Sequence, residues 1–408
     1  QFVLEEVLRE CSTGAAPRLR VCVAGRSKSR LMAGLEAAGR LCGVDVEGVG
    51  VELADVSDQQ SVKTLAVKTR LLLSCVGPFR EHGFAVAEAC VLSGTDYLDI
   101  SGEPQYLEAV QALLSDAAKQ NSVHVVGSCG FDSVPADMGI IFLQDNFPGE
   151  LCHVEMVAGH SSADGSSASI HATTLQCAVL GYANKHKLRE NRRKILSKET
   201  PFPKYRPPKR GMMWKHGLTE EWCLTNIGAD RSVVARTQHL LHQLEGRTPI
   251  HFTAYFGMHS LTAALRSVLF GVIFVIMGFT AWGRNMLIKH PTFLSLGLFS
   301  WTGPTREQLS QQSFCMTLTG TGWSDTSKPV KERGPPDIVR HVRVAGPDPG
   351  YMGTALLVVQ CAFTMLKEKT SLPQGGGVYT PGAAFLHTNL ITSLQQRGVH
   401  FSLVNHTR

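Results

Sequence analysis

The sequence predicts an α/β protein in which a doubly wound parallel sheet, lacking its first strand, precedes a second α/β domain with an apolar helical insertion. Three observations support this fold class. Short apolar runs alternate with helical patterns through residues 18–127, and parallel strands need such helical crossovers. An uncharged run of seventeen residues, 267–283, interrupts the second half of the chain. The 408 residues exceed what one ordinary domain contains.

The first predicted domain covers residues 1–140. Its opening residues 1–11 are typical of a helix, because Leu4, Val7 and Leu8 recur at helical spacing. Each later apolar run ends in Gly, Pro or Asp and is followed by a helical pattern. We expect strands at residues 18–26, 48–55, 70–79, 97–103 and 123–130, and further helices at 27–41, 59–69, 81–94 and 104–121.

The second predicted domain covers residues 141–408. It contains a basic loop at 184–215 and an apolar hairpin at 261–301. We expect its last part, 350–408, to pack back on the first domain through a helix at 354–368, with a closing strand at 400–405.

The basic loop accounts for the whole positive charge of the chain. The net charge is +6, but residues 185–215 alone carry +10, so the rest of the chain is at −4. Four prolines forbid one long helix here, and few aromatic residues are available for stacking on bases, which argues against a nucleic acid partner. Two alternatives stay open: a solvated loop, or attraction to anionic lipid head groups or an acidic partner.

The apolar hairpin has an uncharged run at the lower limit for crossing a bilayer. A second apolar patch, residues 291–301, follows it after Lys289 and His290. A hairpin that enters and leaves one face of a lipid monolayer or membrane fits this pattern, with Trp282 and Trp301 near the boundary. A true span and a helix buried in the core or in a homo-oligomer interface remain alternatives.

Ligands of doubly wound sheets bind at the carboxyl ends of the strands, so the residues that end each strand are candidates for a dinucleotide site. Arg26 with Ser27 can bind a 2′-phosphate, which points to NADP rather than NAD. Asp55 can accept a hydrogen bond from the adenine amino group, and Gly77 permits close approach of the backbone. The candidate cofactor residues are Gly25, Arg26, Ser27, Asp55, Val76, Gly77, Pro78 and Phe79. Turn geometry or helix capping is the alternative for each.

Glu103 and Asp132 are the candidate catalytic residues, because they would lie where a substrate meets the nicotinamide. A carboxylate can act as an acid or base there if burial tunes its pKa. These two residues belong to a polar cluster with Asp99, Ser101, Ser133 and Asp137. Helix capping is the alternative for this cluster, above all for Ser133 and Asp137. No cysteine or histidine spacing is typical of a metal site, and the absence of paired cysteine motifs indicates reduced thiols inside the cell.

Several motifs resemble the saccharopine dehydrogenase family over nearly the whole chain. They are VAGRS, SCVGPFREHG, YLDISGEPQYLE, GSCGFDSVPADMG, RSVVARTQ, GPTREQLSQQSF and GGGVYTPGAAF. The resemblance implies an NADP-type oxidoreductase whose first domain is similar to saccharopine reductases and to trans-acting enoyl reductases of lipid synthesis. In that family a glycine-rich turn precedes the segment that matches QFVLEEV. We therefore expect a missing N-terminal segment, a gap in the sheet and weak binding of NADPH.

Two functions follow as hypotheses. The first is an NADP-dependent oxidoreductase held at a lipid surface, which acts on a lipid-like or other hydrophobic substrate. The resemblance implies lipid droplets as that surface, with mitochondria as an alternative location. The second is a non-catalytic membrane or lipid-droplet scaffold that retains a dinucleotide-binding fold. No arginine cluster for the two carboxyl groups of saccharopine is visible, so the family name does not give the substrate.

Overall fold

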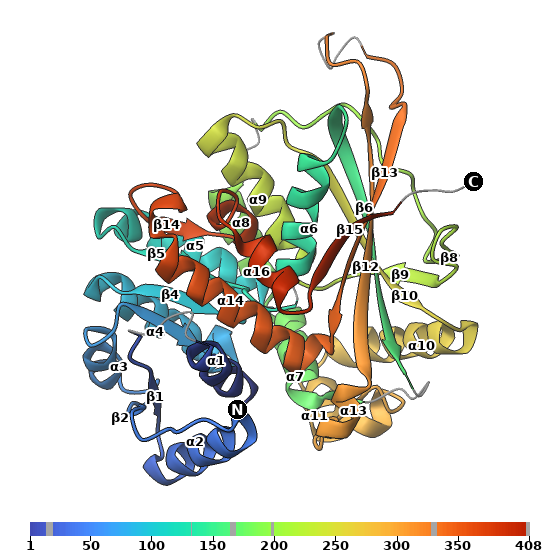
Figure 1. The fold of residues 1–408 in the computed structure, drawn as a ribbon. Coiled ribbons are helices and arrows are strands. Elements are labelled where there is room, and N and C mark those ends of the chain that lie inside the picture. The colour runs from blue at the N-terminus through green and yellow to red at the C-terminus, as the bar shows by residue number, and fades with distance from the viewer. Residues whose placement is uncertain (14–18, 132, 164–168, 197–199, 328–332, 405–408) are drawn as a thin grey trace.

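The fold joins an α/β unit with parallel strands to a large, mostly antiparallel sheet (Figure 1). The structure is a computed structural model that describes residues 1–13, 19–131, 133–163, 169–196, 200–327 and 333–404. The two units share the C-terminal part of the chain, which crosses from one to the other. The α/β class and the parallel sheet that the sequence predicts are confirmed.

The predicted parallel sheet consists of two pieces. One piece pairs β1 with β2, and the other has the order β14-β5-β4-β3. All of these pairings are parallel. In the described part of the chain no strand pairs with both β1 and β3, so the predicted gap in the sheet is present. The strands are β1 (Cys22–Gly25), β2 (Gly50–Leu53), β3 (Leu71–Ser74), β4 (Asp96–Asp99), β5 (His124–Val126) and β14 (Gly377–Tyr379).

Helices cover both faces of the four-stranded piece because alternate strand residues point to opposite sides. Tyr97 and Val125 lie in the apolar cluster formed with α3, α4 and α5. Leu98 and Val126 lie in the other cluster, which includes α14. The N-terminal helix packs between α2 and α14. These helices are α1 (Phe2–Ser12), α2 (Lys28–Cys42), α3 (Gln59–Ala66), α4 (Phe79–Ser93), α5 (Pro104–Gln120) and α14 (Thr354–Lys367).

The second sheet has seven strands in the order β15-β13-β12-β6-β10-β9-β8. Helices α6 and α9 cover its inner face, where α6 packs against β12 and β13. A two-stranded pairing of β7 (Ile170–His171) and β11 (Phe299–Ser300) lies beside it. Further elements of this part of the chain are β6 (Glu150–Ser162), β8 (Met213–Lys215), β9 (Trp222–Thr225), β10 (His251–Met258), β12 (Gln312–Trp323), β13 (Ile338–Pro347), α6 (Val134–Asp145), α9 (Asp230–Glu245) and α13 (Arg306–Ser310).

The C-terminal segment belongs to both sheets. After the π-helix η2 (Pro349–Gly353), α14 packs on β3 and β4, and β14 adds a strand beside β5. Strand β15 (His400–Val404) then returns to the large sheet beside β13. The short elements between them are η3 (Lys369–Ser371), α15 (Pro381–Ala384) and α16 (Leu390–Gln396). This return path carries residues of the second half to the cofactor-binding unit.

The basic segment is not one loop, which corrects the prediction for residues 184–215. Its first part is helix α8 (Lys185–Ile195), which packs on α5. Two of its arginines are paired with buried acids: Arg192 Nη2 lies 2.7 Å from Glu108 Oε1, and Arg210 Nη2 lies 2.9 Å from Glu155 Oε1. Part of the +10 charge therefore neutralises buried carboxylates of the surrounding structure.

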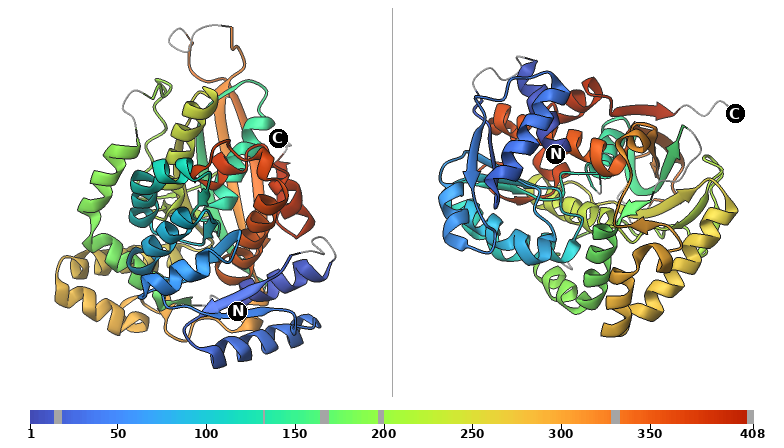
Figure 2. Two further views of the ribbon diagram at one scale, coloured as in Figure 1. Left: turned by 90° about the vertical axis from the view of Figure 1, so that its left-hand side faces the viewer. Right: turned by 90° about the horizontal axis from the view of Figure 1, so that it is seen from below.

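The apolar hairpin forms helices α10 (Leu261–Gly278), α11 (Ala281–Lys289) and α12 (Pro291–Leu294), joined to α7 (Ala172–Ala183) by an apolar cluster. Two helical segments of the described chain are long and apolar enough to cross a membrane, Leu261–Gly278 and Pro349–Lys367. The second is 67% buried and is a core helix, whereas the first is only 11% buried. The alternative of a helix buried in the core of this chain is therefore wrong for α10, which lies at an outer edge of the molecule (Figure 2).

Candidate functional site

The ends of β1 and β2 bring the first group of predicted cofactor residues together. Ala54 donates its backbone N–H to the carbonyl of Gly25 at 3.1 Å, so Arg26 and Asp55 leave adjacent strands at the same edge. Ser27 begins α2, and its hydroxyl accepts the N–H of Arg30 at 3.4 Å. Arg26 is exposed. This edge therefore presents a guanidinium and a helix N-terminus together, which suits a phosphate.

Asp55 is held as a carboxylate. Its Oδ1 accepts from the N–H and the hydroxyl of Ser57 at 3.0 and 2.7 Å. These hydrogen bonds lower the pKa of Asp55, and the charges of Arg26 and His82 add to the effect. His82 lies in the first turn of α4, which follows β3, so each piece of the parallel sheet contributes a basic residue that acts on this carboxylate.

The second group lies in the turn from β3 to α4. Val76 is 43% exposed, and a Cβ added at Gly77 would meet nothing closer than the Phe79 ring at 3.8 Å. Gly77 and Pro78 are joined by a cis peptide bond, and Pro78 is the N-cap of α4. Phe79 turns inward and packs its ring 5.6 Å from that of Tyr106. The backbone of residues 76–78 is therefore accessible to a ligand, while the packed ring of Phe79 holds the turn in place.

The side chain of Glu103, which precedes α5, binds this turn. Its Oε1 accepts the backbone N–H of Phe79 at 2.7 Å, and its Oε2 lies 3.2 Å from Arg80 Nη1. The carboxylate is 4% exposed and does not cap α5, although Glu103 is the N-cap residue. Both oxygens are engaged, which favours a role in positioning the turn. Catalysis by Glu103 stays a prediction.

Sequence reasoning missed two partners of Glu103. Arg80 also donates from Nε to Gln105 at 2.6 Å. Cys177, on α7, lies with its Sγ 3.6 Å from Glu103 Oε1, and burial together with the negative charge of Glu103 raises the pKa of this thiol to about 12. The thiol is therefore protonated. Cys177 is 74 positions away from Glu103, so no local pattern could have linked them.

The other carboxylates of the predicted polar cluster serve the interior. Asp99 accepts from the backbone of Ser101 and Ser128 and from the hydroxyl of Tyr106. Asp137 accepts from Thr237 and from the N–H of Gly382, both at 2.7 Å. Burial raises the pKa of Asp99, and it raises that of Asp137 to about 6. Ser133 makes no capping bond in α6, and Asp137 accepts from the second residue of α15 rather than from its own helix. Asp132 lies outside the described residues.

These strand ends agree with the chemistry of a dinucleotide. The exposed Arg26 and the N-terminus of α2 can bind a phosphate, and the uncrowded Gly77 admits a ring beside the backbone. A bound nicotinamide cofactor would exchange a hydride with a substrate here, donated by NADPH or accepted by NADP+. No group of three or more metal-ligating side chains occurs within the parts of the chain that the structure describes.

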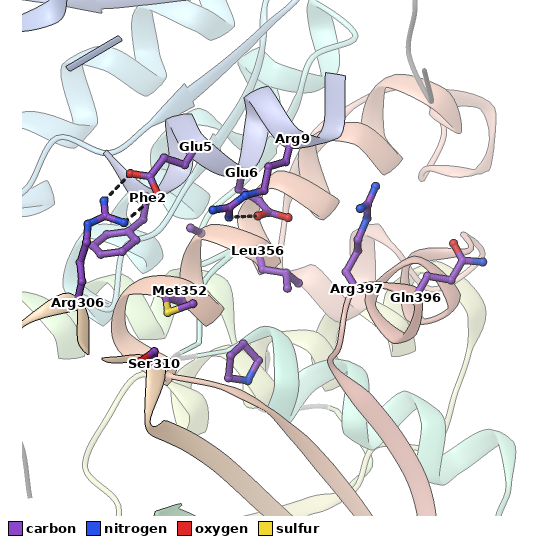
Figure 3. Close-up of a pocket in the computed structure, with 12 residues that line it drawn as sticks. Phe2, Glu5, Glu6, Arg9, Arg306, Ser310, Met352, Leu356, Gln396 and Arg397 are labelled. Carbon is purple, nitrogen blue, oxygen red and sulfur yellow. Dashed lines mark hydrogen bonds and ion pairs between the residues drawn. The ribbon is translucent and has the colours of Figure 1, made fainter. Parts of the chain in front are cut away.

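A second feature is a groove between α1 and the start of α14, with a volume of about 620 Å³ (Figure 3). Its α1 wall follows one helical face: Phe2, Glu5, Glu6 and Arg9. Met352 and Leu356 line the opposite wall, while Arg306 and Arg397 stand at the two ends. We call it the α1–α14 groove. Sequence reasoning missed it because most of the residues that face α1 come from the last quarter of the chain.

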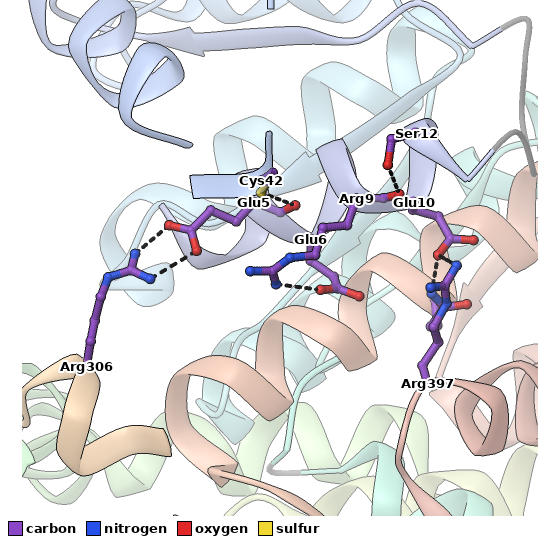
Figure 4. Close-up of polar contacts among 9 residues, drawn as sticks. Glu5, Glu6, Arg9, Glu10, Ser12, Cys42, Arg306 and Arg397 are labelled. Atoms are coloured by element: carbon purple, nitrogen blue, oxygen red, sulfur yellow. Dashed lines mark hydrogen bonds and ion pairs between the residues drawn. The ribbon is translucent and has the colours of Figure 1, made fainter. Parts of the chain in front are cut away.

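Ion pairs hold α1 along this groove (Figure 4). At one end Arg306 makes a two-pronged pair with Glu5, which is 2% exposed, and stacks 4.4 Å from the Phe2 ring. At the other end Arg397 Nη2 lies 2.5 Å from Glu10 Oε2. Between them Arg9 Nη1 lies 3.3 Å from Glu6 Oε2, and the side chain of Arg9 is 52% exposed.

The chain is similar to known proteins throughout its length. The family model for the saccharopine dehydrogenase NADP-binding domain matches residues 1–126. The saccharopine dehydrogenase-like oxidoreductase of Rattus norvegicus is 36% identical and aligns with 99% of this chain and 94% of its own length. An Arabidopsis thaliana relative named as a mitochondrial saccharopine dehydrogenase-like oxidoreductase is 34% identical, over 99% of this chain and 94% of the relative.

A relative and a solved structure complete the comparison. The lipid droplet localized protein of Caenorhabditis elegans is 34% identical over 94% of this chain and 91% of the relative. The glutamate-forming saccharopine dehydrogenase of Saccharomyces cerevisiae matches with a TM-score of 0.55 at 12% identity, and the match covers 99% of this chain and 98% of that chain. This likeness shows the fold alone. The expectation that an N-terminal segment with a strand and a glycine-rich turn is missing is not borne out by these matches.

Proposed function

The chain belongs to the saccharopine dehydrogenase-like oxidoreductase family, and from this premise we propose that it is an NADP-dependent oxidoreductase held at a lipid surface. Its substrate in this proposal is lipid-like or otherwise hydrophobic. The cofactor part is supported by the NADP-binding domain match and by the open strand ends at Arg26 and Gly77. The name of the C. elegans relative supports a lipid droplet, and that of the Arabidopsis relative supports mitochondria as the alternative.

The exposed face of α10 is the observation that carries the lipid surface. Leu265, Leu269 and Ile276 recur at helical spacing and are 50%, 53% and 66% exposed. The opposite face, with Phe270, packs on the cluster with α7 and α11. Phe279, Trp282 and Phe293 extend the exposed apolar surface and are 69%, 70% and 82% exposed. Contiguous apolar surface of this kind marks an interaction site.

The charge around α10 favours an anionic lipid surface. Residues 246–306 contain no Asp or Glu, whereas Arg266, Arg284 and Lys289 lie on α10 and α11. A helix that combines a large apolar face with basic residues binds in the plane of the interface and is attracted by anionic head groups. The monotopic alternative is therefore the one that we propose, with α10 lying on the surface rather than crossing it.

Flotation with liposomes tests the lipid surface. We compare the 408-residue chain with the double variant L269S/I276S, which changes only exposed positions, and with the control variant Leu41→Ser, which changes an exposed leucine on α2. We expect the chain and the control to float with vesicles that contain phosphatidylserine, and the double variant to remain in the soluble fraction. Flotation of the double variant at the level of the chain would contradict the proposed surface.

NADPH oxidation tests the catalytic part. The chain is mixed with NADPH and lipid extracts or acyl substrates, and absorbance at the nicotinamide band is followed. Substrate-dependent loss of NADPH supports an oxidoreductase. Bound NADPH that never turns over would instead favour the non-catalytic scaffold.

A further inference from the structure

We propose that a groove at one end of the large sheet binds an acidic peptide segment of a partner protein. The groove lies between the segment that follows α8 and the connection from β12 to β13, and its volume is about 460 Å³. Lys204, Tyr205 and Arg206 line one side, and Trp323 and Arg333 line the other. We call it the basic groove. It shares no residue with α10 or with the strand ends proposed for NADP.

Lys204 and Arg206 are cations of the basic segment that remain available to a ligand. Arg192 and Arg210 of the same segment are paired with buried acids. Lys204 and Arg206 are both exposed, and in the part of the chain that the structure describes no hydrogen bond or ion pair reaches either side chain. Exposure alternates along residues 203–206, as in an extended chain, so both cations lie on one side, roughly 7 Å apart along the backbone. Alternate side chains of an extended acidic peptide repeat at the same interval.

The acids around the basic groove are engaged elsewhere. Glu150 Oε2 lies 2.7 Å from Arg333 Nη1. Asp337 accepts the N–H and the hydroxyl of Ser324 and does not line the groove. Among the described residues that line it, none is an Asp or Glu. A ligand carboxylate therefore meets Lys204 and Arg206 without competition from a lining carboxylate.

The walls of the basic groove argue against two other kinds of ligand. Trp323 is 7% exposed and Arg333 stacks on it at 5.4 Å, while the Tyr205 ring packs 5.8 Å from His153. A nucleotide base therefore finds no exposed ring on which to stack. Of the described lining residues none is an exposed large apolar side chain, although insertion into a lipid surface requires such side chains. Charge complementarity to a peptide needs neither feature.

The position of the basic groove favours a protein over a lipid surface. Trp323 pairs with Glu150 at one end of β6. Near the other end His259 Nε2 lies 2.7 Å from the carbonyl of His160, and α10 begins at Leu261. Residues 150–160 of β6 span roughly 33 Å at about 3.3 Å per residue, and Figure 1 shows α10 and the β12–β13 connection at opposite ends of the sheet. This step rests on the lipid surface proposed at α10, whereas peptide binding is measured without lipid.

Fluorescence anisotropy with a labelled peptide of eight glutamates tests the proposal, with a peptide of eight glutamines as the uncharged probe. The variant K204Q/R206Q removes both available cations, which pair with no acid of the described chain, so folding is retained. We expect it to weaken binding of the glutamate peptide about tenfold, because each exposed ion pair contributes modestly. The matched control R189Q/R193Q removes the same charge from exposed positions of α8 and should bind as the unsubstituted chain does. The glutamine peptide should not bind.

Three outcomes would overturn the basic groove as a peptide site. The first is equal binding of the glutamate peptide by K204Q/R206Q and R189Q/R193Q, or no binding by the chain itself. The second is displacement of the peptide by inorganic phosphate far more effectively than by chloride at the same ionic strength, which would indicate a site for small anions.

The third outcome is loss of flotation with phosphatidylserine vesicles in K204Q/R206Q, which would place the basic groove at the lipid surface. A chain that binds the glutamate peptide but does not float would refute the lipid surface at α10 and support the basic groove. The two proposals can therefore fail separately. Circular dichroism of each variant establishes that it is folded.

Discussion

Glu103 accepts the backbone N–H of Phe79 across 24 positions of sequence, at 2.7 Å, and so fixes the turn that follows β3. The same carboxylate pairs with Arg80, whose side chain is 17% exposed. A carboxylate buried with its partner is costly to lose, because the partner charge stays behind without compensation.

Replacement of Glu103 therefore tests whether it positions the turn. We expect Glu103→Ala to lower the free energy of unfolding by about 3 kcal/mol and to weaken NADPH binding, since the turn at Gly77 is released. Glu103→Gln keeps an acceptor for Phe79 and should lose less. Thermal unfolding and NADPH titration measure both effects. Equal stability of Glu103→Ala and the exposed control Glu81→Ala would show that the contact carries little energy.

Arg26 determines the choice between NADPH and NADH in our proposal. Its guanidinium is exposed beside Asp55 at the end of β1, where a 2′-phosphate would lie. Arg26→Ala should weaken NADPH binding by roughly 2 kcal/mol, about 30-fold, and leave NADH binding nearly unchanged. Fluorescence titration with both nucleotides measures the ratio. An equal loss for both would place Arg26 away from the 2′-phosphate.

We expect one arginine of helix α8, Arg192, to contribute to stability, whereas the other positive charges of the helix contribute little. Arg192 donates to Glu108, which is 1% exposed and also accepts the hydroxyl of Ser232 at 2.6 Å. Arg192→Ala leaves that buried carboxylate with one partner fewer, so we expect a loss of about 1 to 3 kcal/mol in unfolding free energy. Arg193→Ala on the same helix removes the same charge from an exposed site and should change stability by less than about 0.5 kcal/mol. Similar urea midpoints for the two variants would refute this difference.

The sequence predicted the local elements of the parallel sheet because each depends on periodicity over short stretches. The strand at β4 and the helix at α5 appear where the alternating pattern and Pro104 place them. Contacts between residues that lie far apart in the sequence leave no such periodic pattern. Glu103 with Cys177 and Arg192 with Glu108 are pairs of residues 74 and 84 positions apart. The charge count of the segment therefore could not show that Arg192 has a buried acidic partner.

The C-terminal return shows the same limit. The pattern predicted that residues 350–408 pack back on the first domain, but it did not show that Gly377–Tyr379 would become a strand beside β5. A three-residue strand has too few alternations to be recognised. The α1–α14 groove depends on that return, because Met352 and Arg397 reach α1 only through it.

Asp137 should make stability depend on pH. It is fully buried between α6, α9 and α15, where Thr237 and Gly382 both donate to Oδ2, and in the described part of the chain no hydrogen bond reaches Oδ1. Burial raises its pKa from 3.8 to about 6, although the hydrogen bonds and the charge of Arg236 oppose the shift. Between about pH 4 and 6 the folded protein therefore binds more protons at this site than the unfolded chain.

The free energy of unfolding should consequently fall as pH rises through this window, by about 3 kcal/mol in total from Asp137, and stay at the lower level above pH 6. Asp137→Asn keeps an acceptor for Thr237 and Gly382 and cannot titrate, so its stability should not show this fall. Urea unfolding from pH 4.5 to 7 measures the difference between the two proteins, in which the other titrating groups cancel. The exposed control Asp116→Asn should follow the unsubstituted chain. A buried carboxyl with this raised pKa must release its proton when the protein unfolds between about pH 4 and 6. If the free energy of unfolding depended on pH in the same way for the chain and for Asp137→Asn, Asp137 would not titrate in this range.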